Sequence, residues 1–125
     1  MSSGLNGKKR RGIHYSFIYA IEGILHGIIH ERNLKIHSVI ALTVIIFGFL
    51  FDINRYEWMF VILAIGGMFS LELLNTAIER MVDYISPQYH PLAKQAKDVA
   101  AGAVLVFACM SVIIGCIIFL PKIYH

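Results

Sequence analysis

Three long stretches of this chain are dominated by apolar residues, and each is long enough to cross a membrane as a helix. They cover about residues 34–52, 58–85 and 97–120. Residues 99–120 alone give 22 consecutive uncharged positions. At about 1.5 Å per residue, such a helix crosses a hydrocarbon core of about 30 Å. The pattern therefore predicts an all-α membrane protein with three spans, in a single domain over residues 1–125.

A fourth helix is predicted before the first span, over residues 14–31. Its apolar residues recur at helical spacing and leave a polar face opposite them. The apolar face carries Phe17, Ile18, Ile21, Ile24, Leu25, Ile28 and Ile29. This amphipathic pattern predicts a surface helix in the cytoplasmic interface of the membrane. Residues 1–12, rich in Gly, Ser, Lys and Arg, are predicted to form a disordered basic tail that stays near the membrane by charge.

The distribution of basic residues predicts how the chain is oriented. Of its 11 Lys and Arg residues, only Arg55 and Lys122 follow the first or the third span, and the other nine fall at the opposite ends of the spans. Cytoplasmic segments carry the excess of Lys and Arg in membrane proteins. We therefore expect a cytoplasmic N-terminus and a C-terminus outside. The net charge of +3 is explained by this topology, so no nucleic-acid partner is expected.

The second span carries a stripe of polar residues that packing alone does not require. Glu72, Asn75, Glu79 and Asp83 are spaced so that they share one narrow face of a helix. An ionisable side chain at membrane depth costs a few kcal/mol or more, which indicates a functional site. The alternative is a set of hydrogen bonds that joins neighbouring helices. Counting from Trp58 places Glu72 about 21 Å into the membrane, near the inner headgroups and at the level of a lipid hydroxyl.

Further candidate residues lie at the same inner level. Lys97 and Asp98 begin the third span, and Glu31 precedes the first. Taken alone, Lys97 is explained as a topology charge and Glu31 as a solvated turn residue. Beside an acidic stripe, however, a lysine suits a polyphosphate chain, and a hard cation such as Mg²⁺ takes oxygen ligands from several elements.

The histidines of the N-terminal third offer a competing interpretation. His26 and His30 are four residues apart, and His37 would share a similar face if the helix continued. No third ligand and no cysteine partner is fixed by spacing, and there is no HExxH motif. We therefore expect these histidines to have no metal role.

Two sequence blocks resemble a known family. ELLNTAIE at 72–79 and AKD at 96–98 resemble the bacterial integral-membrane diacylglycerol kinases, with similarity from about residue 19 to residue 120. The longer stretches ERNLKIH, IGGMFSLELLNTAIE and HPLAKQAKD look most like the Gram-positive branch, whose members act mainly as undecaprenol kinases. The resemblance implies a homotrimeric bundle in the bacterial plasma membrane, with active sites formed between subunits at the cytoplasmic face.

The resemblance also implies roles for individual residues. Glu72 would be the general base that takes the proton of the lipid hydroxyl. Glu31 and Glu79 would hold Mg²⁺ on the ATP phosphates, and Asn75 would position the site.

The implied nucleotide contacts come from other elements. Lys97 would neutralise the β- and γ-phosphates of ATP, Asp98 would hold the nucleoside end, and Tyr19 would lie near the nucleotide. Phosphoryl transfer requires mainly positioning and charge neutralisation, which these residue types supply.

The expected function is ATP-dependent phosphorylation of a membrane lipid alcohol, with undecaprenol as the expected acceptor and diacylglycerol as the alternative. A proton- or ion-coupled transport subunit is the alternative from another class. Transport sites usually lie near the bilayer midplane in repeated halves. The acidic residues here lie in one leaflet, and no internal repeat is visible.

Overall fold

The computed structural model describes residues 12–124 of the chain. Within this range the chain forms four helices, α1 (Ile13–His30), α2 (Arg32–Leu50), α3 (Arg55–Ile85) and α4 (Pro91–Ile123). Of the segment 1–12 that was predicted to be disordered, residues 1–11 lie outside the described part, and Gly12 is the N-cap of α1.

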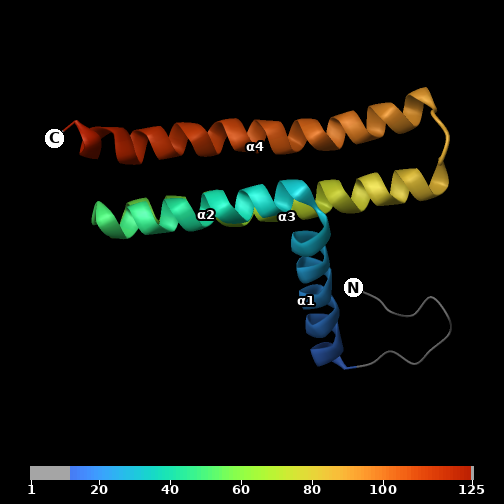
Figure 1. The fold of residues 1–125 in the computed structure, drawn as a ribbon, viewed down its shortest axis with the longest axis horizontal. Coiled ribbons are helices and arrows are strands. Elements are labelled where there is room, and N and C mark those ends of the chain that lie inside the picture. The colour runs from blue at the N-terminus through green and yellow to red at the C-terminus, as the bar shows by residue number, and fades with distance from the viewer. Residues whose placement is uncertain (1–11, 125) are drawn as a thin grey trace.

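The helices form a bundle of three with the fourth lying crosswise. Helices α2, α3 and α4 run side by side, and α3 packs against both of the others (Figure 1). Helix α1 points away from the bundle, crosswise to the long axis of the other three helices, and contacts α2 and α3. Helices α2, α3 and α4 are each long and apolar enough to cross a membrane. The predicted all-α class with three candidate spans is confirmed.

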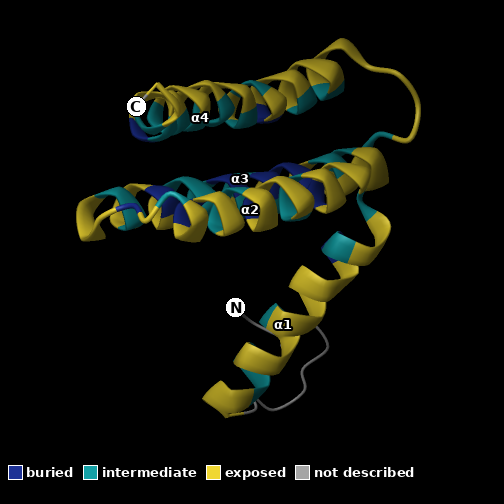
Figure 2. Cartoon of the chain, turned by 60° about the vertical axis from the view of Figure 1, so that its left-hand side comes forward, coloured by how far each residue is buried: buried dark blue, intermediate teal, exposed yellow. Residues whose placement is uncertain are grey.

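Burial within a single chain is concentrated on the central helix. The buried positions gather mainly on α3 and the faces turned towards it, whereas α1 and the outer faces of α2 and α4 are exposed (Figure 2). Many of the exposed residues are large and apolar, including Phe49, Leu63, Leu105 and Ile117. Such surfaces are suited to contact with lipid chains or with another copy of the chain.

A single extended residue separates α1 from α2. Glu31 has φ −103° and ψ 122°, and its N–H still donates to the carbonyl of Gly27 at 2.8 Å. A Cβ on Gly27 would lie 2.8 Å from Cδ1 of Leu34, so the close approach of the two helices depends on glycine at this position. Because the helix breaks at Glu31, the condition under which His37 would share the histidine face of α1 is not met.

The ends of α3 and α4 have local causes, some of which the sequence prediction missed. Helix α3 begins at Arg55, three residues before the predicted start, because Asn54 and Glu57 form a reciprocal capping box with both hydrogen bonds at 2.9 Å. Helix α4 begins at Pro91, where the His90 imidazole accepts from the N–H of Leu92. The predicted span 97–120 therefore lies inside a longer helix.

At the end of the bundle where α2 connects to α3, the three helices share a small apolar core. Ile53, Val61 and Ile118 are its buried members. A 3.4 Å ion pair between Lys122 and Glu57 joins α4 to α3 at the same end. This packing holds the hairpin of α3 and α4 together far from the polar stripe.

A glycine halfway along α3 sets the distance to α4. The ring of Phe107 rests against Gly67, and a Cβ on Gly67 would overlap the ring. We expect Gly67→Ala to lower the free energy of unfolding by about 1–3 kcal/mol, because the ring must move out of a packed contact. Thermal unfolding in detergent micelles measures the loss.

The neighbouring glycine provides a matched control. A Cβ on Gly66 meets nothing within 4 Å, so Gly66→Ala should be as stable as the wild type or slightly more stable, because alanine is favoured over glycine within a helix. Combining Gly67→Ala with Phe107→Leu should recover part of the stability. Equal stability of the Gly67→Ala variant and the wild type would contradict the packing role of Phe107.

Candidate active site

The most deeply buried carboxylate among the described residues is Glu72, which is 2% exposed. It lies on α3, and its polar contacts come from the first turns of α2. Asn33 Nδ2 donates to one carboxylate oxygen at 3.3 Å, and His37 Nε2 lies 3.7 Å from the other. A buried carboxylate that receives directed contacts from a second helix is held in one orientation.

One turn further along α3, Asn75 and Thr76 are also buried. The amide nitrogen of Asn75 donates to Oε1 of Glu79 at 3.5 Å. Its carbonyl oxygen, Oδ1, is buried and has no hydrogen-bond partner within the described part of the chain. An unsatisfied buried acceptor is costly, so Asn75 Oδ1 is a strong candidate to contact a ligand or another subunit.

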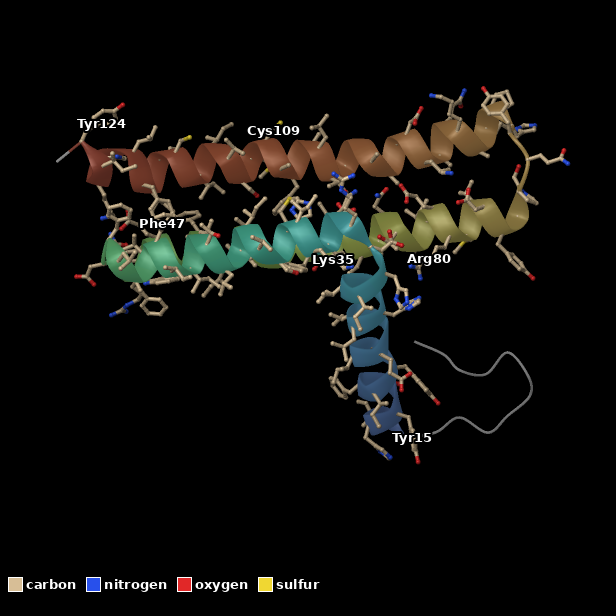
Figure 3. All side chains as sticks on the ribbon, viewed as in Figure 1. Tyr15, Lys35, Phe47, Arg80, Cys109 and Tyr124 are labelled. Atoms are coloured by element: carbon tan, nitrogen blue, oxygen red, sulfur yellow. The ribbon has the colours of Figure 1, made fainter. Side chains whose placement is uncertain are left out.

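Glu31 approaches the same region of α3 from the break between α1 and α2. Its carboxylate accepts from Arg80 Nη2 at 2.6 Å. Arg80 follows Glu79 directly, so Glu31 and Glu79 lie at the same level of the molecule. Figure 3 shows Arg80 on α3 just beyond the point where α1 leaves the bundle, on the side of the α3–α4 connection.

The far end of the polar stripe faces the start of α4. Lys97 Nζ donates to Asp83 at 2.8 Å, and Lys94 Nζ donates to Asp98 at 2.6 Å. These residues line an open cavity of about 370 Å³ beneath the α3–α4 connection, together with Ser86, Pro87, Gln88, Tyr89, His90 and Ala93. The cavity carries both charge signs and is accessible from the end of the bundle.

Of the predicted site residues, Tyr19 is the one that the contacts described above do not place beside another site residue. It is 42% exposed on α1. Within residues 12–124, no hydrogen bond or ion pair joins it to the carboxylates. The neighbouring residues Ala20 and Gly23 instead line a groove of about 380 Å³ between α1 and α3.

The structure adds three residues that the sequence prediction did not assign to the site. Asn33 and His37 contact Glu72, and Arg80 contacts Glu31. Asn33 and His37 are four residues apart at the inner end of a predicted span, which is the level at which Glu72 was placed. Their spacing and depth could therefore have identified them as neighbours of Glu72. Arg80 was interpreted only as a topology charge.

The arrangement separates three chemical environments along α3. A buried carboxylate lies beside apolar surface, acidic and amide oxygens follow one or two turns later, and an exposed cavity with lysines comes last. Within residues 12–124, no group of three or more His, Cys, Asp or Glu side chains is close enough to hold a metal ion by itself. A lipid alcohol, a metal-bound polyphosphate and a nucleoside would suit these environments in that order.

Comparison with known proteins agrees with this chemistry. Residues 18–119 match the family described as prokaryotic diacylglycerol kinase. The chain is 57% identical to the undecaprenol kinase of Bacillus subtilis (strain 168) over 86% of its own length and 88% of that protein. It is 39% identical to a diacylglycerol kinase of Synechocystis, of which it spans 62%, and 30% identical to that of Escherichia coli K12, of which it spans 82%. The chain therefore belongs to the prokaryotic diacylglycerol kinase family and is a membrane lipid kinase.

Proposed function

We propose that this protein transfers the γ-phosphate of ATP to undecaprenol at the cytoplasmic face of the bacterial plasma membrane and so produces undecaprenyl phosphate. The observation that carries the choice of acceptor is the identity of 57% to the undecaprenol kinase, against 39% and 30% to the two diacylglycerol kinases. Diacylglycerol is the second candidate acceptor, because the family and those two relatives carry its name.

In the proposed reaction Glu72 is the general base. It accepts the proton of the lipid hydroxyl while that oxygen bonds to the γ-phosphorus and the bond to the leaving ADP breaks. The position of Glu72 supports this role, since the next residue, Leu73, packs near Gly27 of α1. If α1 lies in the interface, Glu72 is at the depth of the hydroxyl group at the end of the lipid substrate.

The nucleotide would occupy the open cavity at the far end of the stripe. Lys97, oriented by Asp83, is proposed to neutralise the β- and γ-phosphates. Asp98 is proposed to accept hydrogen bonds from the nucleoside end. Tyr19 does not line this cavity in the single chain, so its proposed place near the nucleotide requires a site shared between subunits. The cavity lies beyond the point where α1 leaves the bundle, which suits a water-soluble substrate.

The residues present are suited to Mg²⁺ as the cofactor. Glu31, Glu79 and the unpartnered Oδ1 of Asn75 are oxygen donors at one level of the bundle. Mg²⁺ is commonly bound by one or two carboxylates, substrate phosphates and water. The carboxylates of Glu31 and Glu79 fit this mode of binding. We propose that Glu31 and Glu79 hold the ion, which when bound would neutralise charge on the ATP phosphates.

A homotrimer with composite sites is part of the proposal. The exposed apolar faces of α2 and α4 support subunit contacts, and the single chain leaves the α3 stripe open towards its nucleotide end. The orientation with a cytoplasmic N-terminus is supported by the Lys and Arg distribution. It would place the stripe and the cavity on the side where ATP is available.

The test is transfer of labelled γ-phosphate from Mg-ATP to lipid by the purified protein in micelles, with undecaprenol and diacylglycerol compared side by side. We expect stronger labelling of undecaprenol, and loss of labelling when EDTA removes the metal. Preference for diacylglycerol would correct the acceptor and retain the kinase. If neither lipid is labelled by a protein that is still folded, the proposed activity is wrong.

A further inference from the structure

A general base must return to its starting state after each turnover, and the burial of Glu72 makes this step difficult. In the proposed reaction Glu72 gains one proton for each lipid that is phosphorylated. Its side chain is only 3% exposed, so bulk water has little direct access to the carboxyl group. The proton must therefore leave through a neighbouring group that both touches Glu72 and reaches the exterior.

Two side chains contact the Glu72 carboxylate within residues 12–124. Asn33 donates through its amide nitrogen, and an amide does not accept a proton near neutral pH. His37 presents Nε2 to the other carboxylate oxygen, and imidazole is the side chain that gains and loses protons most readily in this pH range. Of the two contacts, His37 alone has the chemistry to carry the proton away.

The position of His37 fits this task. Its Nε2 lies 3.7 Å from the carboxylate, and a movement of less than about 1 Å would bring it to hydrogen-bonding distance. Its side chain is 22% exposed in the single chain and lies in the second turn of α2, near the end of that helix that the proposed orientation places at the cytoplasmic face. It also lines an apolar groove of about 250 Å³ between α2, α3 and α4. An apolar groove offers the proton no alternative route on that side.

The side chains around His37 allow it to accept the proton of Glu72. The charged group that faces it within the described chain is Glu72 on α3. Across the groove, α4 presents the hydroxyl of Ser111, which is buried and has no hydrogen-bond partner there. A protonated imidazole is therefore attracted to an ionised Glu72, and no cation in these contacts opposes it.

We propose that His37 is a positioning residue for Glu72, which it orients together with Asn33, and that it carries the proton of Glu72 to water between turnovers. The inference rests on the proposed function. The O–H bond of the Glu72 carboxyl group breaks as its proton bonds to Nε2 of neutral His37. The imidazolium then loses a proton to water, so that the ionised carboxylate and the neutral imidazole are both restored.

The experiment compares His37→Ala and His37→Gln with the wild type in the lipid phosphorylation assay. We expect kcat to fall about 10²-fold in both variants, which is within the usual range for acid–base groups. The KM for ATP should stay unchanged, because His37 touches no proposed nucleotide contact. Adding free imidazole should restore several-fold activity to His37→Ala, since a small base can enter the space that the side chain leaves.

His26→Gln is the matched control. It removes an imidazole from the same half of the molecule, but its ring contacts His30 on α1 and not Glu72. It should keep wild-type kcat and show no response to imidazole. Glu72→Gln should be inactive with or without imidazole.

The results separate the inference from the proposed function. A His37→Ala variant with wild-type kcat would overturn the inference. If Glu72→Gln is inactive, a slow His37→Ala variant that free imidazole does not stimulate would overturn it too. A wild-type protein that phosphorylates no lipid would overturn the proposed function, and the inference with it. A His37→Ala variant that is slow but recovers with imidazole must be folded. This result would support proton transfer from Glu72 to water through His37.

Discussion

Replacing Glu72 by glutamine is expected to lower kcat for lipid phosphorylation by about 10³-fold or more, within the range typical of general-base removal. Glutamine has nearly the same shape and can still accept from Asn33, so the packing between α2 and α3 should survive. It cannot accept the proton of a lipid hydroxyl at neutral pH. ATP affinity and the oligomeric state should change little. Steady-state kinetics in micelles and size-exclusion chromatography measure these quantities.

Glu57→Gln is the matched control for this prediction. Glu57 lies in the first turn of the same helix, far from Glu72, and glutamine also fits its place in the capping box. This variant should therefore keep wild-type kcat. If Glu72→Gln retains near-normal turnover instead, another group removes the proton, and the assignment of the general base is wrong.

Removal of the Lys97 charge is the second prediction with a large effect. Lys97→Met should reduce kcat/KM for ATP by about 10²–10³-fold, the usual loss when one preorganised group that stabilises transition-state charge is removed. Methionine keeps the length of the side chain but leaves Asp83 without its 2.8 Å partner. The uncompensated carboxylate then repels the phosphates. Initial rates at varied ATP concentration, with saturating lipid, test this.

Lys122→Met is the control for loss of a lysine charge. Lys122 pairs with Glu57 at the opposite end of α4, far from the proposed nucleotide cavity. Its removal should lower stability slightly and leave kcat/KM for ATP unchanged. Similar kinetic losses in both variants would indicate a general effect of charge removal, and Lys97 would lose its assigned role.

The fold was predictable from the sequence where hydrophobic spacing determines it. The uncharged runs gave the three candidate spans, and the amphipathic pattern gave α1 to within one residue at each end. The start of α3 was missed because the prediction relied on Trp58 as a membrane-edge marker. The local hydrogen bonds of Asn54 and Glu57 begin the helix earlier, and their Asn-x-x-Glu spacing was visible in the sequence.

The candidate site was predictable along one helix but not between helices. Helical spacing alone places Glu72, Asn75 and Glu79 on one face of α3, and the structure keeps them there. The contact of Glu31 with Arg80 joins residues 49 apart in sequence, and it depends on how sharply α1 turns away from α2. No spacing rule predicts that angle, so the pairing of Glu31 with Arg80 required the structure.

The crosswise direction of α1 has a consequence for how the enzyme would respond to bilayers of different thickness. If α1 rests in the interface, as proposed, it serves as a depth reference, because its Gly27 packs against Leu34 of α2 and Leu73 of α3. Lipid tails that are longer or shorter than usual would then displace the opposite end of the bundle, which is held by the small apolar core and the Lys122–Glu57 ion pair. The reacting groups would keep their distance from the cytoplasmic surface. Catalysis would thus be insulated from changes in lipid composition that alter the thickness of the membrane.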